Sequence, residues 1–128
     1  MAAFLSDGWA AEASDPAAAA MAAGGRPIRV QHILTGGPDG ERRIGSVVDA
    51  AGSVETVAGD IADPDVIFTL AAADALTILR GDVSPNVAYM RGRLKAAGHT
   101  GRLLELLAEA DGPVYDDVRA ALWERTET

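Results

Sequence analysis

Cysteine is absent from the 128 residues of this chain, and aromatic residues make up only 5% of it. Without cysteine the chain has neither a disulfide nor a thiolate nucleophile, and a structural zinc site would need other ligands. No run of about 18 apolar residues occurs, so the sequence predicts no membrane-spanning helix. The length predicts one domain over residues 1–128, stabilised by a single hydrophobic core.

Lysine and arginine are also scarce, with 11 of them against 19 acidic residues and a formal net charge of −8. Nucleic-acid binding requires basic side chains that neutralise phosphates, so this balance argues against it. An anionic membrane repels the average charge, although a local basic stretch leaves a transient membrane contact open. The N-terminus has no basic region ahead of its alanine-rich stretch, so we expect no signal peptide and a cytoplasmic protein.

Alanine, by contrast, is abundant. A genome rich in G and C would enrich alanine without any functional reason. Small side chains also leave space for a ligand cavity, because a filled core needs bulky residues. Composition leaves both explanations open.

The first part of the chain predicts a helical segment over residues 4–23, followed by strands. The apolar stripe of that segment consists of Phe4, Leu5, Trp9, Ala13 and Ala20. Pro16 predicts a break, or the first turn of a second helix capped by Ser14 or Asp15. Alternating apolar and polar residues then predict a meander of three strands, Ile28–Thr35, Arg42–Asp49 and Ser53–Ala58.

The second part predicts a short buried strand, Val66–Leu70, and then mostly helices. Asp74 opens a helix that ends at Gly81, and Ser84 followed by Pro85 starts the next one. The remaining segments are a strand, Gly92–Gly98, a helix, Thr100–Ala110, and a C-terminal helix, 113–125. Strands come together first and helices cluster later. We therefore expect an α+β fold with a mainly antiparallel five-stranded sheet and helices packed on one face.

One segment, Asp65–Leu107, carries a motif. It reads DVIFTLAAADALTILRGDVSPNVAYMRGRLKAAGHTGRLLELL and resembles the SCP2 sterol-carrier family in the order and spacing of its residues. The positions that carry the resemblance are Asp65, Asp74, Gly81, Pro85, Ala88, Met90, Gly92, Leu94, Lys95, Gly98, Leu103 and Leu106. Weaker similarity extends back to Ile28, and the stretch 4–9 is similar to the start of bacterial stand-alone members.

The resemblance implies a hydrophobic pocket between the sheet and the helices formed from Asp74 to Ala110. It implies binding or carriage of a fatty acyl chain, a sterol-like molecule or another apolar ligand, with no covalent chemistry and no cofactor. The residues expected to line the pocket are Phe68, Leu76, Leu79, Val87, Met90, Leu94, Leu103, Leu107 and Trp123. Trp123 is a hypothetical lid over the pocket mouth. Taken one at a time, seven of these residues are better explained as ordinary core: Leu76, Leu79, Val87, Met90, Leu103, Leu107 and Trp123.

No arrangement of residues predicts catalysis or metal binding. Ser46 does not lie in a nucleophile elbow, and His32 and His99 are assigned to different predicted strands. Three aspartates share one loop without the spacing of a metal site: Asp60, Asp63 and Asp65. We therefore predict that the chain is not an enzyme and that it holds no metal.

A local basic patch, Arg91, Arg93 and Lys95, continues towards His99 and Arg102. It suits a lipid head group, a ligand carboxylate or an acidic partner, or it is only a solvated strand face. A second function also stays open, in which the same fold has a collapsed pocket and works by dimerising or by docking on a partner enzyme. The volume of the pocket in a structure would separate this docking module from a carrier.

Overall fold

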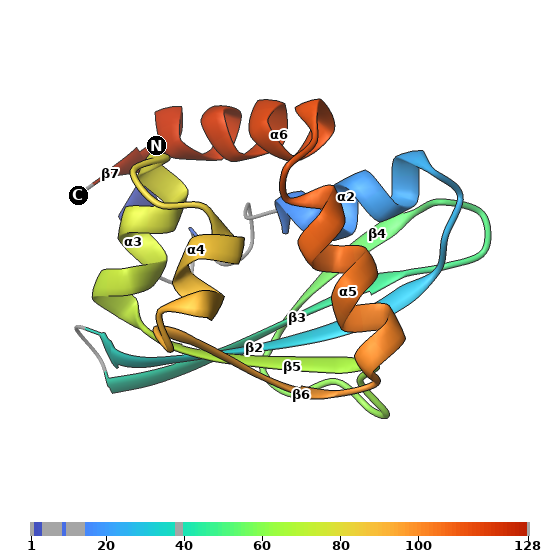
Figure 1. The fold of residues 1–128 in the computed structure, drawn as a ribbon, viewed down its shortest axis with the longest axis horizontal. Helices are drawn as coiled ribbons and strands as arrows, with labels where there is room; N and C mark the ends of the chain where they lie inside the picture. Colours follow the sequence, from blue (N-terminus) through green and yellow to red (C-terminus); the bar gives the residue numbers. More distant parts are fainter. Residues whose placement is uncertain (1, 4–8, 10–14, 38–39, 128) are drawn as a thin grey trace.

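The structure, a computed structural model, describes residues 2–3, 9, 15–37 and 40–127. It has two layers: a five-stranded sheet, and helices that cover one face of that sheet (Figure 1). This arrangement confirms the α+β class that the sequence predicts.

The strand order in the large sheet is β4-β3-β2-β5-β6. These strands are β2 (Ile28–Gly37), β3 (Gly40–Val48), β4 (Val54–Ala58), β5 (Val66–Ala71) and β6 (Leu94–Gly98). Neighbouring strands pair antiparallel, except β2 and β5, which run parallel. The sheet is therefore mainly antiparallel, and β5 inserts beside β2 instead of extending the meander at β4.

Strand alternation decides which side chains face the helices. On β2, Ile28, Val30 and Leu34 are buried, and His32 lies on the same face between them. On β5, the buried residues Val66, Phe68 and Leu70 alternate in the same way. The covered face is thus apolar, with a histidine near its middle.

The helices are α2 (Pro16–Ala23), α3 (Ala72–Arg80), α4 (Pro85–Met90), α5 (Thr100–Glu109) and α6 (Pro113–Glu124). Proline occupies the first turn of α2, α4 and α6, where the missing N–H costs no hydrogen bond. Asp15 caps α2 and Ser84 caps α4, while Gly81 ends α3 in the left-handed conformation with φ 91°. In the described part of the chain, no helix has the length and hydropathy needed to cross a membrane.

Several boundaries differ from the sequence prediction; β6, for example, begins at Leu94 rather than at Gly92. Helix α3 begins at Ala72 rather than at Asp74, because Ala71 already has extended backbone and Asp74 lies in the first turn. His99 does not belong to a strand: β6 ends at Gly98, and the His99 side chain accepts a hydrogen bond from the Arg102 N–H at the start of α5.

The chain ends meet in a way that the sequence does not predict. Strands β1 (Ala2–Ala3) and β7 (Thr126–Glu127) pair in parallel as a separate two-stranded sheet. Nearby, Trp9 Nε1 donates to Thr126 Oγ1 at 2.9 Å. The predicted stripe residues Phe4, Leu5 and Ala13, the alternative cap Ser14 and most of the stretch 4–9 lie outside the described residues.

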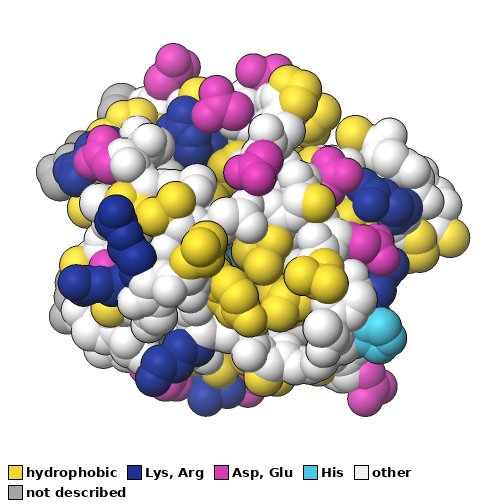
Figure 2. Space-filling model, in the orientation of Figure 1, with side chains coloured by type: hydrophobic (Ala, Val, Ile, Leu, Met, Phe, Trp, Pro, Cys, Tyr) yellow, Lys and Arg dark blue, Asp and Glu magenta, His cyan; other side chains and the backbone are white. Residues whose placement is uncertain are grey.

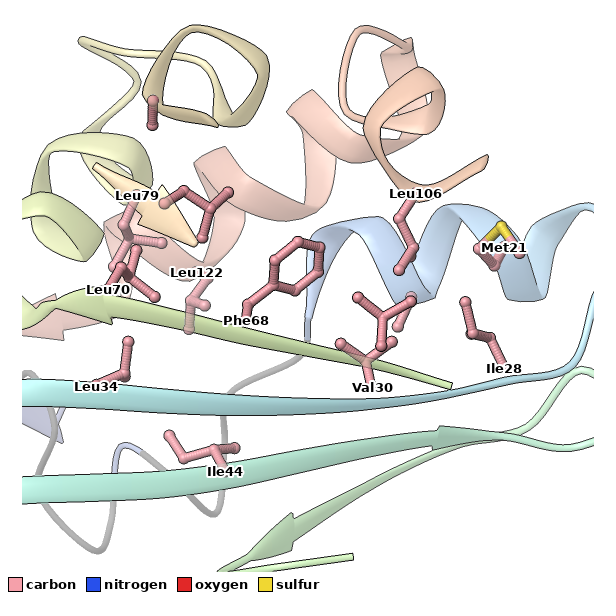
Figure 3. Close-up of a cluster of buried hydrophobic side chains, with 14 of the residues drawn as sticks. Met21, Ile28, Val30, Leu34, Ile44, Phe68, Leu70, Leu79, Leu106 and Leu122 are labelled. Atoms are coloured by element: carbon pink, nitrogen blue, oxygen red, sulfur yellow. The ribbon is translucent and has the colours of Figure 1, made fainter. Parts of the chain in front are cut away.

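One end of the layer between sheet and helices is tightly packed. We call it the closed end and define it by Met21 of α2, Ile28 and Val30 of β2, and Val66 of β5, none more than 1% exposed. Figure 3 shows Met21, Ile28 and Val30 grouped with Leu106, while Leu34, Leu70 and Leu79 form a second group beyond Phe68.

Polar contacts fasten α5 at the closed end. The Arg26 guanidinium pairs with Glu109 and lies 3.6 Å from Glu105, both on α5. Arg102 of α5 donates in return to the Pro27 carbonyl, just before β2. These contacts join α5 to the segment between α2 and β2.

Candidate functional site

A cavity of about 160 Å³ lies between the sheet and the helices. All five strands of the large sheet and each of the helices α2 to α6 contribute to its wall, and most of the contributing side chains are apolar. On the face drawn in Figure 2, hydrophobic side chains gather near the centre, over the region between α4 and α5 in Figure 1. The core is therefore incompletely filled at one place, where an apolar molecule can be held.

The volume limits what fits. An apolar cavity of about 150 Å³ is large enough for benzene. The cavity in this protein thus has space for a small apolar molecule, or for a short part of a longer one, without rearrangement. A complete acyl chain requires the helices to move apart.

Four of the nine side chains predicted to line a pocket do line this cavity: Phe68, Leu79, Leu94 and Leu107. Three others lie outside the lining and are partly buried: Leu76, Leu103 and Trp123. Trp123 packs against the core, and its role as a lid stays a prediction.

The remaining two, Val87 and Met90 of α4, do not line the cavity. They are 38% and 84% exposed, because the short helix α4 turns Ala88 toward the core instead. Helical spacing correctly groups Val87 and Met90 on neighbouring positions, but it does not say which side of α4 faces inward. Ligand contact by any of the nine residues stays a prediction.

Sequence reasoning missed the polar part of the wall. We define the polar corner as Asp15, His32, Ser46 and Tyr115, all of which line the cavity. The signals for it in the sequence are His32 and Ser46, polar residues that alternate with apolar ones on the strand faces of β2 and β3. Asp15, the N-cap of α2, and Tyr115 of α6 both lie outside the motif segment.

Asp15 is held by the first turn of α2. Its Oδ1 accepts hydrogen bonds from the backbone N–H groups of Ala17 at 2.9 Å and Ala18 at 3.2 Å. Its Oδ2 is buried and has no hydrogen-bond partner among the described residues. The helix N-terminus favours the negative charge at this position.

His32 faces this carboxylate from the sheet. Its Nε2 lies 3.6 Å from Asp15 Oδ2, and its ring lies 5.6 Å, centroid to centroid, from the ring of Phe68 on β5. Ser46 of β3, 1% exposed, pairs with Thr56 of β4 in the sheet register, and both line the cavity. A polar strip thus crosses the sheet from β2 to β4.

Ser46, His32 and Asp15 are the residue types of a hydrolytic triad, but their arrangement is different. No hydrogen bond joins Ser46 Oγ to His32 in the described part of the structure, and the Nε2 of His32 faces Asp15. A triad requires the serine and the histidine to be within hydrogen-bond reach. The corner therefore fits recognition of a polar group better than nucleophilic catalysis. Within the described residues, no group of His, Asp or Glu side chains is placed to hold a metal ion.

Tyr115 supplies a neutral hydroxyl. Burial raises the pKa of its phenol well above the usual value, and the charge of Asp15 acts in the same direction. Tyr115 therefore keeps its proton at physiological pH. Arg119, one turn further along α6, is already engaged: it donates to the Leu79 carbonyl at 2.9 Å and to Asp116 Oδ1 at 2.9 Å and 3.1 Å.

Several motif residues serve the fold rather than the cavity. Asp65 Oδ2 accepts from the Arg29 N–H at 2.8 Å, which extends the pairing of β2 and β5. A Cβ added at Gly98 would lie 2.4 Å from the Asp65 carbonyl oxygen, so these two positions constrain each other. Glycine at 98 is needed because the backbones of β5 and β6 approach so closely there.

The basic patch lies apart from the cavity lining. Arg91, Arg93 and Lys95 are exposed, and Arg93 lies 3.7 Å from Asp74 of α3. Lys95 follows the cavity-lining residue Leu94 on β6, so the pleat directs it to the opposite face of the sheet. A role for the patch in ligand binding stays a prediction.

Comparison with known proteins gives one family. A model of the SCP-2 sterol transfer family matches residues 11–108. A search of curated proteins found no significant match.

Solved structures share the fold at low sequence identity. A conserved hypothetical protein from Thermus thermophilus, described as possibly a sterol carrier protein, is 20% identical with a TM-score of 0.61 over 96% of this chain and 90% of that one. Palmitated sterol carrier protein 2-like 2 from Aedes aegypti is 16% identical with a TM-score of 0.59, over 78% of this chain and 96% of that one.

A third structure places the fold within a larger protein. The sec-alkylsulfatase Pisa1 from Pseudomonas sp. is 18% identical with a TM-score of 0.53, over 70% of this chain but only 14% of that one. The match is therefore to a small part of that enzyme.

Proposed function

Because this chain belongs to the SCP-2 sterol transfer family, we propose that it binds and carries an apolar ligand in the cavity between its sheet and its helices, without covalent chemistry. The observation that carries the proposal is the cavity itself, an apolar space left unfilled in an otherwise close-packed core. A docking module with a collapsed pocket would fill this space with side chains. The cytoplasmic location expected from the sequence belongs to the same proposal.

The binding energy indicates that the cavity expands when it is loaded. Each buried methylene contributes about 0.8 kcal/mol, and micromolar affinity needs about 8 kcal/mol beyond the costs of association. About ten methylenes must therefore be buried, which is more than a benzene-sized space accommodates. Carriage thus requires the helices to separate from the sheet.

Helix α4 is the element best suited to move. It has six residues, its Pro85 borders the cavity, and Asn86 donates to the Leu107 carbonyl of α5 at 2.7 Å. Helix α5 is fastened at its base by Arg26, whereas α4, with the sequence PNVAYM, carries no charged side chain that could form an ion pair. We expect loading to break the Asn86 contact before it disturbs the closed end.

The proposal is tested by titration of the delipidated protein with Nile red, an uncharged dye that fluoresces in apolar surroundings. We expect saturable binding near one dye per chain, and native mass spectrometry of the gently purified protein should show a co-purified apolar molecule. Absence of both would overturn the carrier function and favour the docking module.

A matched pair of substitutions tests whether the dye binds in the cavity. Ala110→Leu adds bulk to a residue that lines the cavity, and we expect it to weaken dye binding at least tenfold. Ala108→Leu makes the same change at an exposed position of α5 and should leave binding unchanged. Equal effects of the two substitutions would place the dye elsewhere on the protein.

A further inference from the structure

An unpartnered buried acceptor lies at the polar corner, on a residue that lines the cavity. The Asp15 side chain is only 9% exposed, and its Oδ2 receives no hydrogen bond from any described residue although Oδ1 receives two. Buried acceptors in folded proteins are almost always hydrogen-bonded. This oxygen therefore lacks a donor that a ligand can supply.

The sheet does not fully supply that donor. His32 Nε2 is 3.6 Å from Asp15 Oδ2, longer than a hydrogen bond, and the imidazole is also packed on Phe68. The Oδ2 atom of Asp15 thus lies near the His32 Nε2 atom, and the Phe68 ring lies beside that imidazole. A ligand head group that approaches from the cavity can bridge the two.

Tyr115 adds the complementary group. Its hydroxyl is protonated, makes no hydrogen bond to another described residue, and borders the same cavity. Tyr115 can therefore donate to a ligand oxygen while Asp15 accepts from the same ligand. This combination suits an alcohol, which both donates and accepts, and an amine, which donates to Asp15 alone.

A carboxylate is poorly matched to this corner. It cannot donate to Asp15 Oδ2, and its charge repels the carboxylate that α2 holds in place. Arg119 is the permanently charged base among the described lining residues, and its guanidinium is already paired with Asp116 and bound to the Leu79 carbonyl. The described part of the wall thus offers no unpaired arginine or lysine that would compensate.

We propose that Asp15, with Tyr115, selects the head group of the ligand: an apolar molecule whose polar end donates a hydrogen bond, an alcohol or an amine, in preference to a fatty acid. The inference rests on the proposed carrier function and specifies its ligand class.

Three probes with the same ten-carbon chain test it: 1-decanol, decylamine and decanoic acid, each displacing Nile red from the delipidated protein at pH 7.4 and below its solubility limit. We expect the alcohol or the amine to displace the dye at concentrations at least tenfold lower than the acid. A stronger alcohol indicates that Tyr115 contributes, and a stronger amine indicates that the charge of Asp15 dominates.

The substitution Asp15→Asn tests whether the Asp15 carboxylate causes the preference for the alcohol or the amine over the acid. Asparagine caps helices as well as aspartate does, so α2 should persist while the unpartnered charge is removed. We expect the gap between decanoic acid and the other probes to shrink at least fivefold. Asp49→Asn is the control, because Asp49 Oδ1 also accepts from two backbone N–H groups but does not line the cavity.

The outcomes separate the two proposals. If Nile red binds but decanoic acid displaces it as well as the other probes do, or if no probe displaces it, the head-group inference is wrong and the carrier function stands. An unchanged preference in Asp15→Asn also overturns the inference. If Nile red itself does not bind, the carrier function fails and the inference fails with it.

Discussion

The closed end and the cavity lie beneath the same helices and on the same face of the same sheet, yet they are packed in opposite ways. Met21, Ile28, Val30 and Val66 are sealed from solvent, and none of them borders the cavity. The cavity begins two residue pairs further along β2 and β5, at His32 and Phe68, the next pair on the same face of the sheet. The tightly packed core and the cavity thus lie at different places along the same pair of strands.

The size of the helical side chains explains the difference. At the closed end Met21 of α2 fills the space above the sheet. Over the cavity the helices present alanines at Ala17, Ala75 and Ala110, between larger side chains such as Leu79 and Leu107. Ala18 shows that alanine is also used for close packing, since it is fully buried and does not line the cavity. The abundance of alanine therefore serves the cavity at some positions and tight contact at others.

The largest effect expected from this comparison is a loss of stability at the closed end. Ile28→Ala should lower the free energy of unfolding by about 3–4 kcal/mol, because the cavity that it creates is enclosed on all sides. Leu79→Ala should cost less, about 2 kcal/mol, because Leu79 already has the natural cavity on one side. Urea denaturation followed by circular dichroism measures both values, and equal costs would contradict the division into two ends.

A second prediction uses the opposite change. Ala18→Leu should destabilise the protein by about 1–3 kcal/mol, because no space is available for the added carbons. Ala110→Leu should change the melting temperature little, since its added carbons enter the cavity. Differential scanning calorimetry measures the melting temperatures of the two variants. A larger decrease for Ala110→Leu would contradict the conclusion that free space lies beside Ala110 and none beside Ala18.

The smallest effects concern two glycines in the turns that follow α3 and α4. Gly81 and Gly92 both have positive φ, at 91° and 73°, so alanine at either is strained by about 1 kcal/mol. At Gly81 a Cβ would also lie 2.8 Å from Arg119 Nη1, whereas at Gly92 no atom lies within 4 Å.

Gly81→Ala should therefore cost more than Gly92→Ala, by roughly the value of the displaced Arg119–Leu79 hydrogen bond, about 1 kcal/mol. Thermal unfolding of the two variants measures the difference. If the two variants are equally stable, Arg119 moves aside at no cost and its hydrogen bond to Leu79 does not stabilise the protein.

The local patterns of the sequence predict most of the fold. Alternation places Ile28, Val30 and Leu34 on one buried face, and Ser84-Pro85 starts a helix where the structure has α4. The motif segment is enough to indicate the family, and Asp65 and Gly98 show why its spacing is constrained. Each of these sequence patterns reflects interactions within a few residues of the chain, or within one pair of neighbouring strands.

The cavity wall is predictable only in part, for a physical reason. Phe68, Leu79, Leu94 and Leu107 line it as expected, but Val87 and Met90 do not, because the rotation of α4 is decided by what it packs against. Helical periodicity defines a face, and only tertiary contacts decide where that face points.

By itself, the sequence determined the elements, their caps and turns, and the family, because each depends on short-range backbone preferences and hydrophobic alternation. Only the tertiary structure decided that β5 enters beside β2, that Trp9 meets Thr126, and that Asp15 faces His32 across a cavity. These contacts join residues far apart along the chain, and they form only when burial of the whole apolar face selects one arrangement of the helices over the sheet.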